Sequence, residues 1–261
     1  MSYIDAHCHL ADARFDDDRD AVLARAKEAG IGAFIQGGVG PEDWARQLNL
    51  KRDGWVLCFG LHPWWVAERN ESQCEDGLAA LEARLPQAAF LGELGLDYFD
   101  RFPSACFPLQ QRMFRRQLAL AHQHGKPVAL HLVRCHEDAL AILEEQGPPP
   151  RGGLVHAFTA SFEIAERYLA MGLLISVGGP VTRPGYRKLK HAVSRLPETA
   201  LVIESDAPDI PPHGRMGGRN EPAFLWETAT AVADLRKTSP EAVLAQSAAN
   251  LKRCFDKELM P

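Results

Sequence analysis

The feature that most constrains the fold is a regular alternation between short apolar runs and segments with helical patterning. The apolar runs predict strands at residues 3–10, 33–39, 55–61, 90–96, 128–133, 153–158, 173–177 and 201–204. Helical patterning is expected at residues 19–29, 42–51, 75–85, 109–124, 137–145, 162–171, 186–196 and 221–236, with one more helix at 240–255. Strands that alternate with helices form parallel βαβ units with right-handed crossovers. We therefore predict an α/β fold, a single (β/α)₈ TIM barrel with an extra C-terminal helix.

The length fits this prediction, because 261 residues is close to the size of such a barrel, roughly 250 residues. We expect one domain over residues 1–261. An open, doubly wound sheet is the main alternative. That fold favours a glycine-rich turn after the first strand, and residues 7–12 contain no glycine.

Charge and cysteine usage narrow the class of protein. The net charge of −5 gives no support to a non-specific binder of duplex nucleic acid, which is usually basic. The six cysteines show no CxxC spacing, so we expect free thiols in a reducing compartment. The first residues lack the pattern of a signal peptide, and no apolar run is long enough to span a membrane. A cytoplasmic location, with no membrane association and no obligate protein partner, is expected.

Ligand-type side chains follow the ends of most predicted strands. The carboxyl ends of barrel strands carry the catalytic groups, so these side chains are expected at one rim. They are His7, His9, His62, Glu93, Asp97, His131, Arg134, His136, His156, Glu204 and Asp206.

The first predicted strand ends in a His-x-His pair. Residues i and i+2 of a strand share a face, so His7 and His9 are expected to point together into the mouth of the barrel. Neutral imidazole is the commonest metal ligand, although two hydrogen-bonded core histidines fit the same pattern. Asp5 precedes them by the same spacing and is expected to support the ligands from behind.

An acidic residue interrupts the apolar strand at 90–96. Glu93 is costly to bury unless it binds a metal or pairs with an arginine, and its two oxygens could bridge two ions. His131 and His156 follow neighbouring strands and predict a second metal position beside it. Asp206 is a candidate ligand and proton acceptor, and Glu204 on the same face is a candidate to orient a ligand.

Two tryptophans follow the His62-Pro63 turn in a predicted rim loop. Trp64 and Trp65 could stack on unpaired bases or could equally pack the loop onto the barrel.

Taken in order, these motifs resemble the TatD family of metal-dependent deoxyribonucleases over essentially the whole chain. The matching motifs are His7-x-His9, Gly60-Leu61-His62-Pro63, Gly92-Glu93-Leu94-Gly95-Leu96-Asp97, His131, His156-Ala157-Phe158-Thr159, Glu204-Ser205-Asp206-Ala207-Pro208 and Arg219-Asn220-Glu221-Pro222. The resemblance implies an amidohydrolase-type TIM barrel that holds two divalent metal ions.

The resemblance also implies roles for individual residues. His7, His9 and Asp206 would hold one ion, His131 and His156 the other, and Glu93 would bridge them, with Asp206 and Glu93 as the catalytic groups. Substrate contacts are expected from His62, Arg134, His136 and Asn220. The family usually has an arginine where this chain has Val133, and the adjacent Arg134 is the candidate to replace it.

These observations predict a dinuclear hydrolase that cleaves phosphodiester bonds of DNA, on single-stranded or terminal segments, with Mg, Mn or Zn. The same metal chemistry would serve a hydrolase of a small ester, amide or phosphoester, or of the ester bond in aminoacyl-tRNA. A barrel that binds metal without catalysis is a third alternative, disfavoured by a candidate base beside the ligands.

Overall fold

The computed structural model describes residues 2–255, whose strands are all parallel and follow the chain order. One hydrogen-bonded sheet contains β1–β3 and the other contains β4–β9. The strands are β1 (Tyr3–Cys8), β2 (Ile31–Gln36), β3 (Trp55–Val56), β4 (Cys58–Phe59), β5 (Phe90–Asp97), β6 (Val128–Val133), β7 (Gly153–Val155), β8 (Leu173–Val177) and β9 (Leu201–Ile203).

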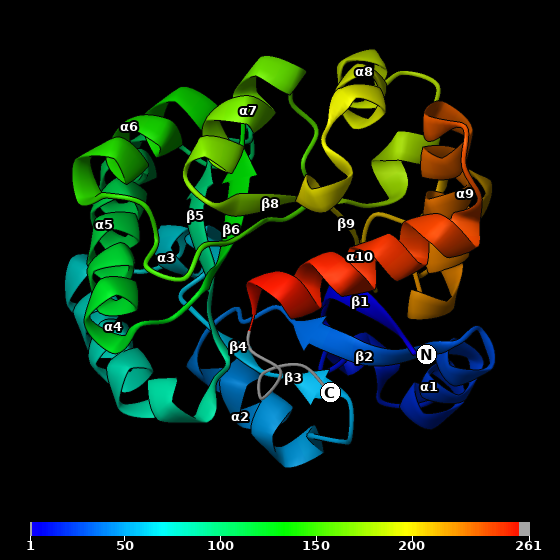
Figure 1. Ribbon diagram of the computed structural model, residues 1–261. Helices are drawn as coiled ribbons and strands as arrows, with labels where there is room; N and C mark the ends of the chain where they lie inside the picture. The colour runs from blue at the N-terminus through cyan, green and yellow to red at the C-terminus, as the bar shows by residue number, and fades with distance from the viewer. Residues whose placement is uncertain (1, 256–261) are drawn as a thin grey trace.

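The two sheets join at both of their edges. β3 and β4 form the single strand expected at 55–61, interrupted at Leu57, whose carbonyl accepts from Ala89 N at 2.9 Å. Beyond β9 the chain returns to β1, where Asp206 N donates to His7 O at 2.9 Å and His9 N donates to Ala207 O at 2.7 Å. Figure 1 shows the helices as a ring around the strands. The predicted barrel class is confirmed.

The helices lie close to their predicted positions. They are α1 (Arg19–Glu28), α2 (Pro41–Leu50), α3 (Pro63–Ala67), α4 (Glu71–Arg84), α5 (Phe107–His124), α6 (His136–Gln146), α7 (Phe162–Ala170), α8 (Arg187–Arg195), α9 (Leu225–Arg236) and α10 (Pro240–Cys254). Two differences matter for the site. The short helix α3 was not predicted, and α9 begins later than expected because a 3₁₀ turn, Pro222–Phe224, precedes it.

The interior of the barrel is an apolar cluster to which every strand contributes one residue or two alternate residues. Its strand members are Ile4, Ala6, Ala33, Ile35, Val56, Cys58, Phe90, Ala129, Leu154, Leu174 and Val202. Helix α10 adds Ala248 and Leu251, and Phe255 directly after it places its ring 4.6 Å from that of Phe90. The predicted C-terminal helix therefore closes the amino end of the barrel.

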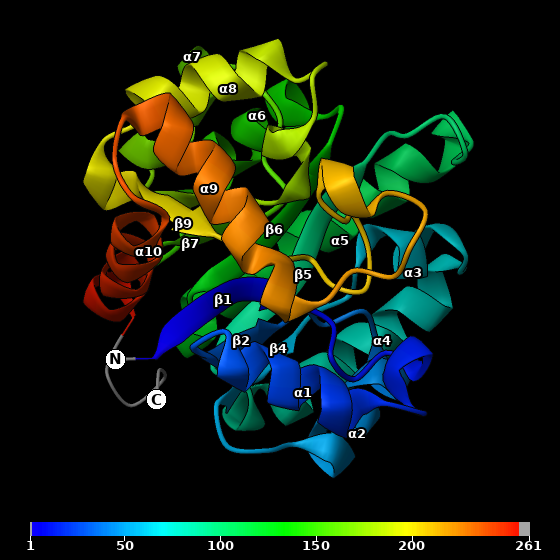
Figure 2. The same ribbon diagram turned by 90° about the vertical axis from the view of Figure 1, so that its right-hand side faces the viewer.

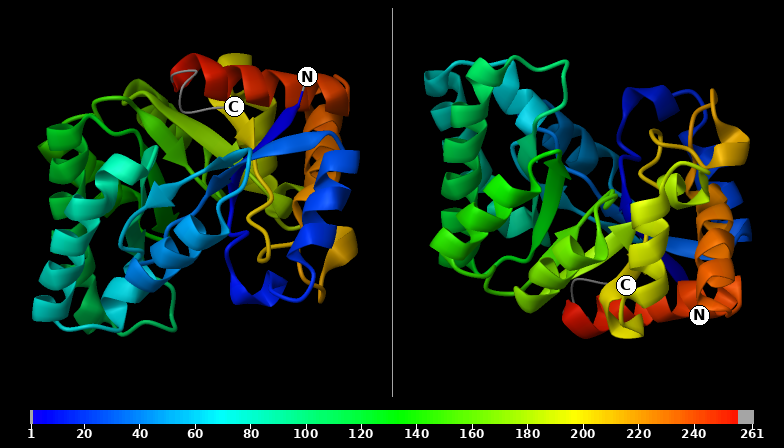
Figure 3. Two further views of the ribbon diagram at one scale, coloured as in Figure 1. Left: turned by 90° about the horizontal axis from the view of Figure 1, so that it is seen from below. Right: turned by 90° about the horizontal axis from the view of Figure 1, so that it is seen from above.

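The side and end views show the consequence for function. α10 lies at one end of the barrel, across β1, while the segments after β5 and β9 project at the other end (Figures 2 and 3). Only the carboxyl end is left open for polar groups, as in other barrels of this class. In the part of the chain that the structure describes, no helix is both long and apolar enough to cross a bilayer.

Candidate metal centre

Strands β1 and β5 each shift register against a neighbouring strand close to a polar residue of the site. Between Gly92 and Leu94, β5 carries one residue more than its partner β6, and the extra residue is Glu93. β1 gains one residue over β2 between Asp5 and Cys8. Such bulges re-aim side chains next to active sites. Here they turn Glu93 and His7 toward the mouth, whereas strict alternation would assign them differently.

The bulge in β1 corrects one expectation. Ile4 and Ala6 face the barrel interior, so Asp5 between them does not share the face of His7 and His9. Its buried carboxylate instead accepts from Ser205 N at 2.8 Å and from the Ser205 hydroxyl. Asp5 thus fastens β1 to the segment that carries Asp206.

One oxygen of Glu93 faces the first group of candidate ligands. Glu93 Oε1 lies 3.4 Å from His7 Nε2 and 3.3 Å from His9 Nε2. Asp206 Oδ1 lies 3.9 Å and 3.5 Å from the same two nitrogens. Asp206 holds a left-handed backbone with φ of 58°, an unusual conformation for a residue other than glycine. Four donor atoms from β1, β5 and the end of β9 therefore converge.

The other oxygen faces a second group. Glu93 Oε2 lies 2.6 Å from His156 Nε2 and 3.4 Å from His131 Nδ1, and these two nitrogens are 2.9 Å apart. One carboxylate therefore lies between two clusters of candidate ligands, the first around His7 and His9 and the second around His131 and His156. The bridging hypothesis for Glu93 requires this placement.

A carboxylate behind His131 fixes the orientation of its ring. His131 Nε2 lies 3.1 Å from Asp97 Oδ2, which leaves Nδ1 facing Glu93. Asp97 also accepts from the indole N–H of Trp64, and sequence reasoning gave it no role. The sequence did contain a signal for this role. Leu94 and Leu96 point outward in β5, so alternation along the strand places Asp97 on the inward face with Glu93. Glu204 accepts from Ala157 N at 2.6 Å and lies 4.0 Å from His156 Nδ1.

His62 lies closer to the clusters than its sequence context indicated. Its Nε2 is 3.1 Å from His131 Nδ1 and 3.6 Å from Glu93 Oε2. Its Nδ1 accepts from Trp64 N at 3.0 Å as the N-cap of α3, so the neutral ring carries its proton on Nε2. Burial and the neighbouring His131 hold the pKa of His62 well below its usual range, which keeps the ring neutral. His62 therefore presents a hydrogen-bond donor rather than a ligand lone pair.

The electrostatics keep the central carboxylate ionised. Burial opposes ionisation, but the surrounding imidazoles, His156 and His7 first, hold the pKa of Glu93 well below its usual range. Burial and His156 lower the pKa of His7 to about 4. Burial also acts on His9, yet Glu93 and Asp206 raise its pKa to about 10.

Divalent cations fit this arrangement on two observations. Among the described residues, five buried atoms of the clusters have no hydrogen-bond partner: His7 Nδ1 and Nε2, Glu93 Oε1 and Oε2, and His156 Nδ1. A Cβ added to Gly37 would lie 2.4 Å from His9 Cε1 and 2.6 Å from Glu93 Oε1, so only glycine leaves this space open. Imidazole and carboxylate donors suit Zn, Mn and Fe.

Comparisons with known proteins identify the family. The family model described as "TatD related DNase" matches residues 4–256. The chain belongs to the TatD-related DNase family. It is 36% identical over 250 residues to the metal-dependent hydrolase YjjV of Escherichia coli, covering 95% of each chain. It is 33% identical to a protein of Erwinia tasmaniensis named 3′-5′ ssDNA/RNA exonuclease TatD, covering 97% of this chain and 99% of that one.

A solved structure shows that the fold is shared throughout. The crystal structure of YjjV, titled a TatD homolog, superposes with a TM-score of 0.89 at 33% sequence identity, covering 97% of this chain and 98% of that chain. The resemblance expected from the sequence motifs is confirmed, and the chain is a member of a family of metal-dependent hydrolases.

Three residues expected to contact substrate lie outside the two clusters. Arg134 pairs with Asp100 at 2.7 Å on the open rim. His136 begins α6, and its Nδ1 lies 3.0 Å from the Tyr168 hydroxyl of α7, which directs it toward the helix layer. The TatD-family motif residue Asn220 is buried, and Nδ2 donates to Ser205 O at 2.6 Å and Asp209 O at 2.8 Å. This geometry makes Asn220 a brace for the segment around Asp206 and offers no support for substrate contact.

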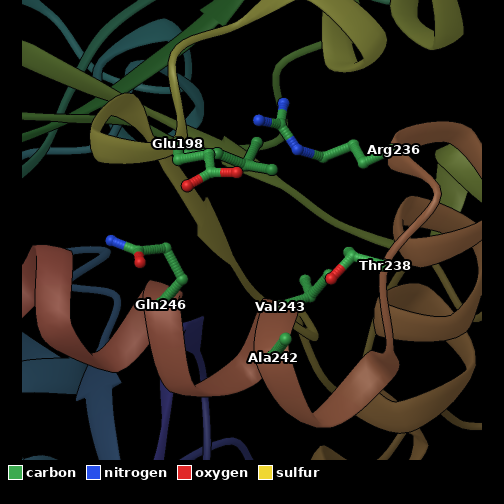
Figure 4. A pocket seen from close by; sticks show the side chains of 7 residues that line it. Glu198, Arg236, Thr238, Ala242, Val243 and Gln246 are labelled. Atoms are coloured by element: carbon green, nitrogen blue, oxygen red, sulfur yellow. The ribbon is translucent and has the colours of Figure 1, made fainter.

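A further pocket lies at the closed end of the barrel. Figure 4 shows it between the start of β9 and α10, where Glu198, Arg236 and Gln246 line it. Leu201 belongs to its wall, and Leu201 begins the strand whose other end leads to Asp206. The pocket is therefore separate from the metal centre of this TatD-family barrel.

Proposed function

We propose that the protein is a dinuclear metal-dependent phosphodiesterase that cleaves single-stranded or terminal segments of DNA. The observation that carries this proposal is the placement of Glu93, whose two oxygens face separate sets of imidazole nitrogens. The exonuclease name of the Erwinia relative supports a nucleic-acid substrate. Free thiols at all six cysteines favour a reducing compartment, in line with a cytoplasmic enzyme.

The chain offers residues for each task that the reaction needs. His7, His9 and Asp206 would hold one ion, His131 and His156 the other, with Glu93 between them. Two ions so placed supply the charge that stabilises the attacking and leaving oxygens of a phosphoryl displacement.

The remaining steps belong to protein groups. Neighbouring histidines, His9 first, outweigh burial and lower the pKa of Asp206, so Oδ1 is ionised and can accept a proton from the attacking water. His62 Nε2–H lies 3.1 Å from His131 Nδ1 and 3.6 Å from Glu93 Oε2, where it can donate to a phosphate oxygen. Asp97 holds His131 in orientation, and Glu204 places a second carboxylate 4.0 Å from His156 Nδ1.

A substrate comparison tests the proposal. Chelated protein is supplied with Mg²⁺, Mn²⁺ or Zn²⁺ and given end-labelled single-stranded DNA, duplex DNA, a chromogenic phosphodiester and a chromogenic carboxylic ester. We expect metal-dependent cleavage of single-stranded DNA that Asp206→Asn abolishes. Turnover of the carboxylic ester without cleavage of any DNA would instead favour the small-molecule alternative, which uses the same ligands.

A further inference from the structure

The rim beside the metal centre carries two exposed aromatic rings, each stacked on an arginine. Trp64 is 37% exposed and Phe99 is 43% exposed, although large apolar side chains are otherwise mostly buried in the described residues. The Arg101 guanidinium lies 3.8 Å from the ring centre of Trp64, and the Arg134 guanidinium lies 4.7 Å from that of Phe99. We name these four residues the rim platform.

A single carboxylate anchors both aromatic residues next to the reacting centre. Asp97 Oδ2 accepts from the Trp64 indole, and Oδ1 accepts from Phe99 N at 2.8 Å. The ring of Trp64 lies 4.7 Å from that of His62 and 5.8 Å from that of His131. The rim platform therefore adjoins the second cluster of ligands, and a nucleoside joined to a phosphate at that cluster would reach it.

Its chemistry matches an unpaired nucleobase. Proteins bind single-stranded nucleic acid by stacking aromatic rings on the bases and placing arginine side chains near the phosphates. This works for any sequence, because every base has a π-face and every linkage carries a negative charge. The neighbouring Trp65 provides the contrast, since it is 8% exposed and packs inward near Gly40 and Gly77. Of the two alternatives that the sequence left open, Trp65 packs its loop onto the barrel, whereas Trp64 has an exposed ring available for stacking.

We propose that the rim platform stacks on the base next to the scissile phosphate and so selects unpaired nucleotides over other phosphoesters. The proposal rests on the proposed function for the identity of the substrate. Trp64 also acts as a positioning residue, because its indole N–H holds Asp97, which orients His131.

Binding of two small ligands tests the rim platform without relying on turnover. Thymidine 5′-monophosphate and 2-deoxyribose 5-phosphate share the sugar and phosphate but differ in the base. Of the five tryptophans, Trp64 is the one on an exposed surface, so stacking should quench its fluorescence. With the full chain and Mg²⁺, we expect the nucleotide to quench and to bind about tenfold more tightly than the sugar phosphate, measured by competition.

Variants separate stacking from positioning. Phe99→Ala and Arg101→Ala should remove most of the preference for the nucleotide and raise KM for an oligonucleotide more than KM for a small chromogenic phosphodiester. Trp64→Phe keeps a ring but loses the indole N–H, so kcat should fall on both substrates. Arg195→Ala is the matched control, because Arg195 lies 4.2 Å from the ring centre of Phe162 in a similar stack on α7 and α8.

The outcomes distinguish this proposal from the proposed function. Equal affinity of the parent chain for both ligands, or Phe99→Ala and Arg101→Ala variants that behave like Arg195→Ala, would overturn the rim platform even if DNA is cleaved. Preferential binding of the nucleotide that Phe99→Ala abolishes would support the rim platform even if no nucleic acid is hydrolysed, in which case the proposed function fails alone.

Discussion

Glu93 Oε2 lies 2.6 Å from His156 Nε2, while Oε1 of the same carboxylate lies 3.4 Å from His7 Nε2. Both histidines are buried, and their rings stack with centres 4.1 Å apart. Two buried imidazoles at this separation repel each other when protonated, and the negative charge of Glu93 between them offsets that repulsion.

Glu93→Gln should prevent both ions from binding, because the amide removes the negative charge that the two clusters share. His131→Ala removes a ligand from one cluster and should reduce the stoichiometry toward one ion per chain. Elemental analysis after equilibration with excess Mn²⁺ or Zn²⁺ measures both effects. A parent protein that never binds more than one ion would refute the dinuclear arrangement.

Gly37→Ala should weaken metal binding although it removes no ligand. The added Cβ would lie 2.6 Å from Glu93 Oε1 and 2.8 Å from His7 Cε1, so the ligands must shift. Gly185→Ala is the matched control, since its Cβ would meet nothing within 4 Å. Calorimetric titration with metal should show a loss for the first variant only, and equal affinities would contradict the steric argument.

Metal removal should lower Tm. An ion that binds only the folded chain stabilises it by about 2.7 kcal/mol at a concentration of about 100 Kd. Thermal unfolding with and without a chelator measures the shift. The Glu93→Gln protein should show almost no dependence of Tm on added metal, and a full response of that variant would place the stabilising ion elsewhere.

Asn220→Ala should both destabilise the chain and weaken metal binding at Asp206. The change leaves the carbonyls of Ser205 and Asp209 without a donor, at a cost of about 1–3 kcal/mol. Urea unfolding gives the stability change, and metal titration gives the affinity.

Asn250→Ala provides the control for this brace. Asn250 Nδ2 also donates to two backbone carbonyls, those of Glu198 and Leu201, each at 2.7 Å, but at the closed end of the barrel. The Asn250→Ala variant should lose about as much free energy of unfolding as Asn220→Ala and should keep the metal affinity of the parent chain. If both variants bind metal as the parent does, Asn220 does not position Asp206.

Thiol labelling should distinguish buried from accessible cysteines. Burial raises the pKa of Cys8 and Cys58 well above the usual value, so these groups stay protonated and unreactive in the folded chain. The half-buried Cys106 and Cys254 should react first. After denaturation without reductant all six should react, as counted by mass spectrometry, and fewer would reveal a disulfide and contradict a reducing compartment.

The sequence by itself determined the order of strands and helices and the end of the barrel at which the ligands gather. The strands at 128–133 and 173–177 have the bounds expected from their apolar runs, because a strand buried on both faces is recognised locally. The convergence of His131 with His156 follows from parallel strands that end at one rim, whereas the i, i+2 spacing brings His7 beside His9.

Only the tertiary structure decided how individual side chains are aimed. The face of Glu93 and of Asp5 depends on register shifts against β6 and β2, and a register exists only once two strands pair. The protonated nitrogen of His62 depends on the cap of α3, and the link from Trp64 through Asp97 to His131 joins three strand ends. Local patterns specify which residues reach the rim, whereas hydrogen bonds between distant segments specify what each of them presents there.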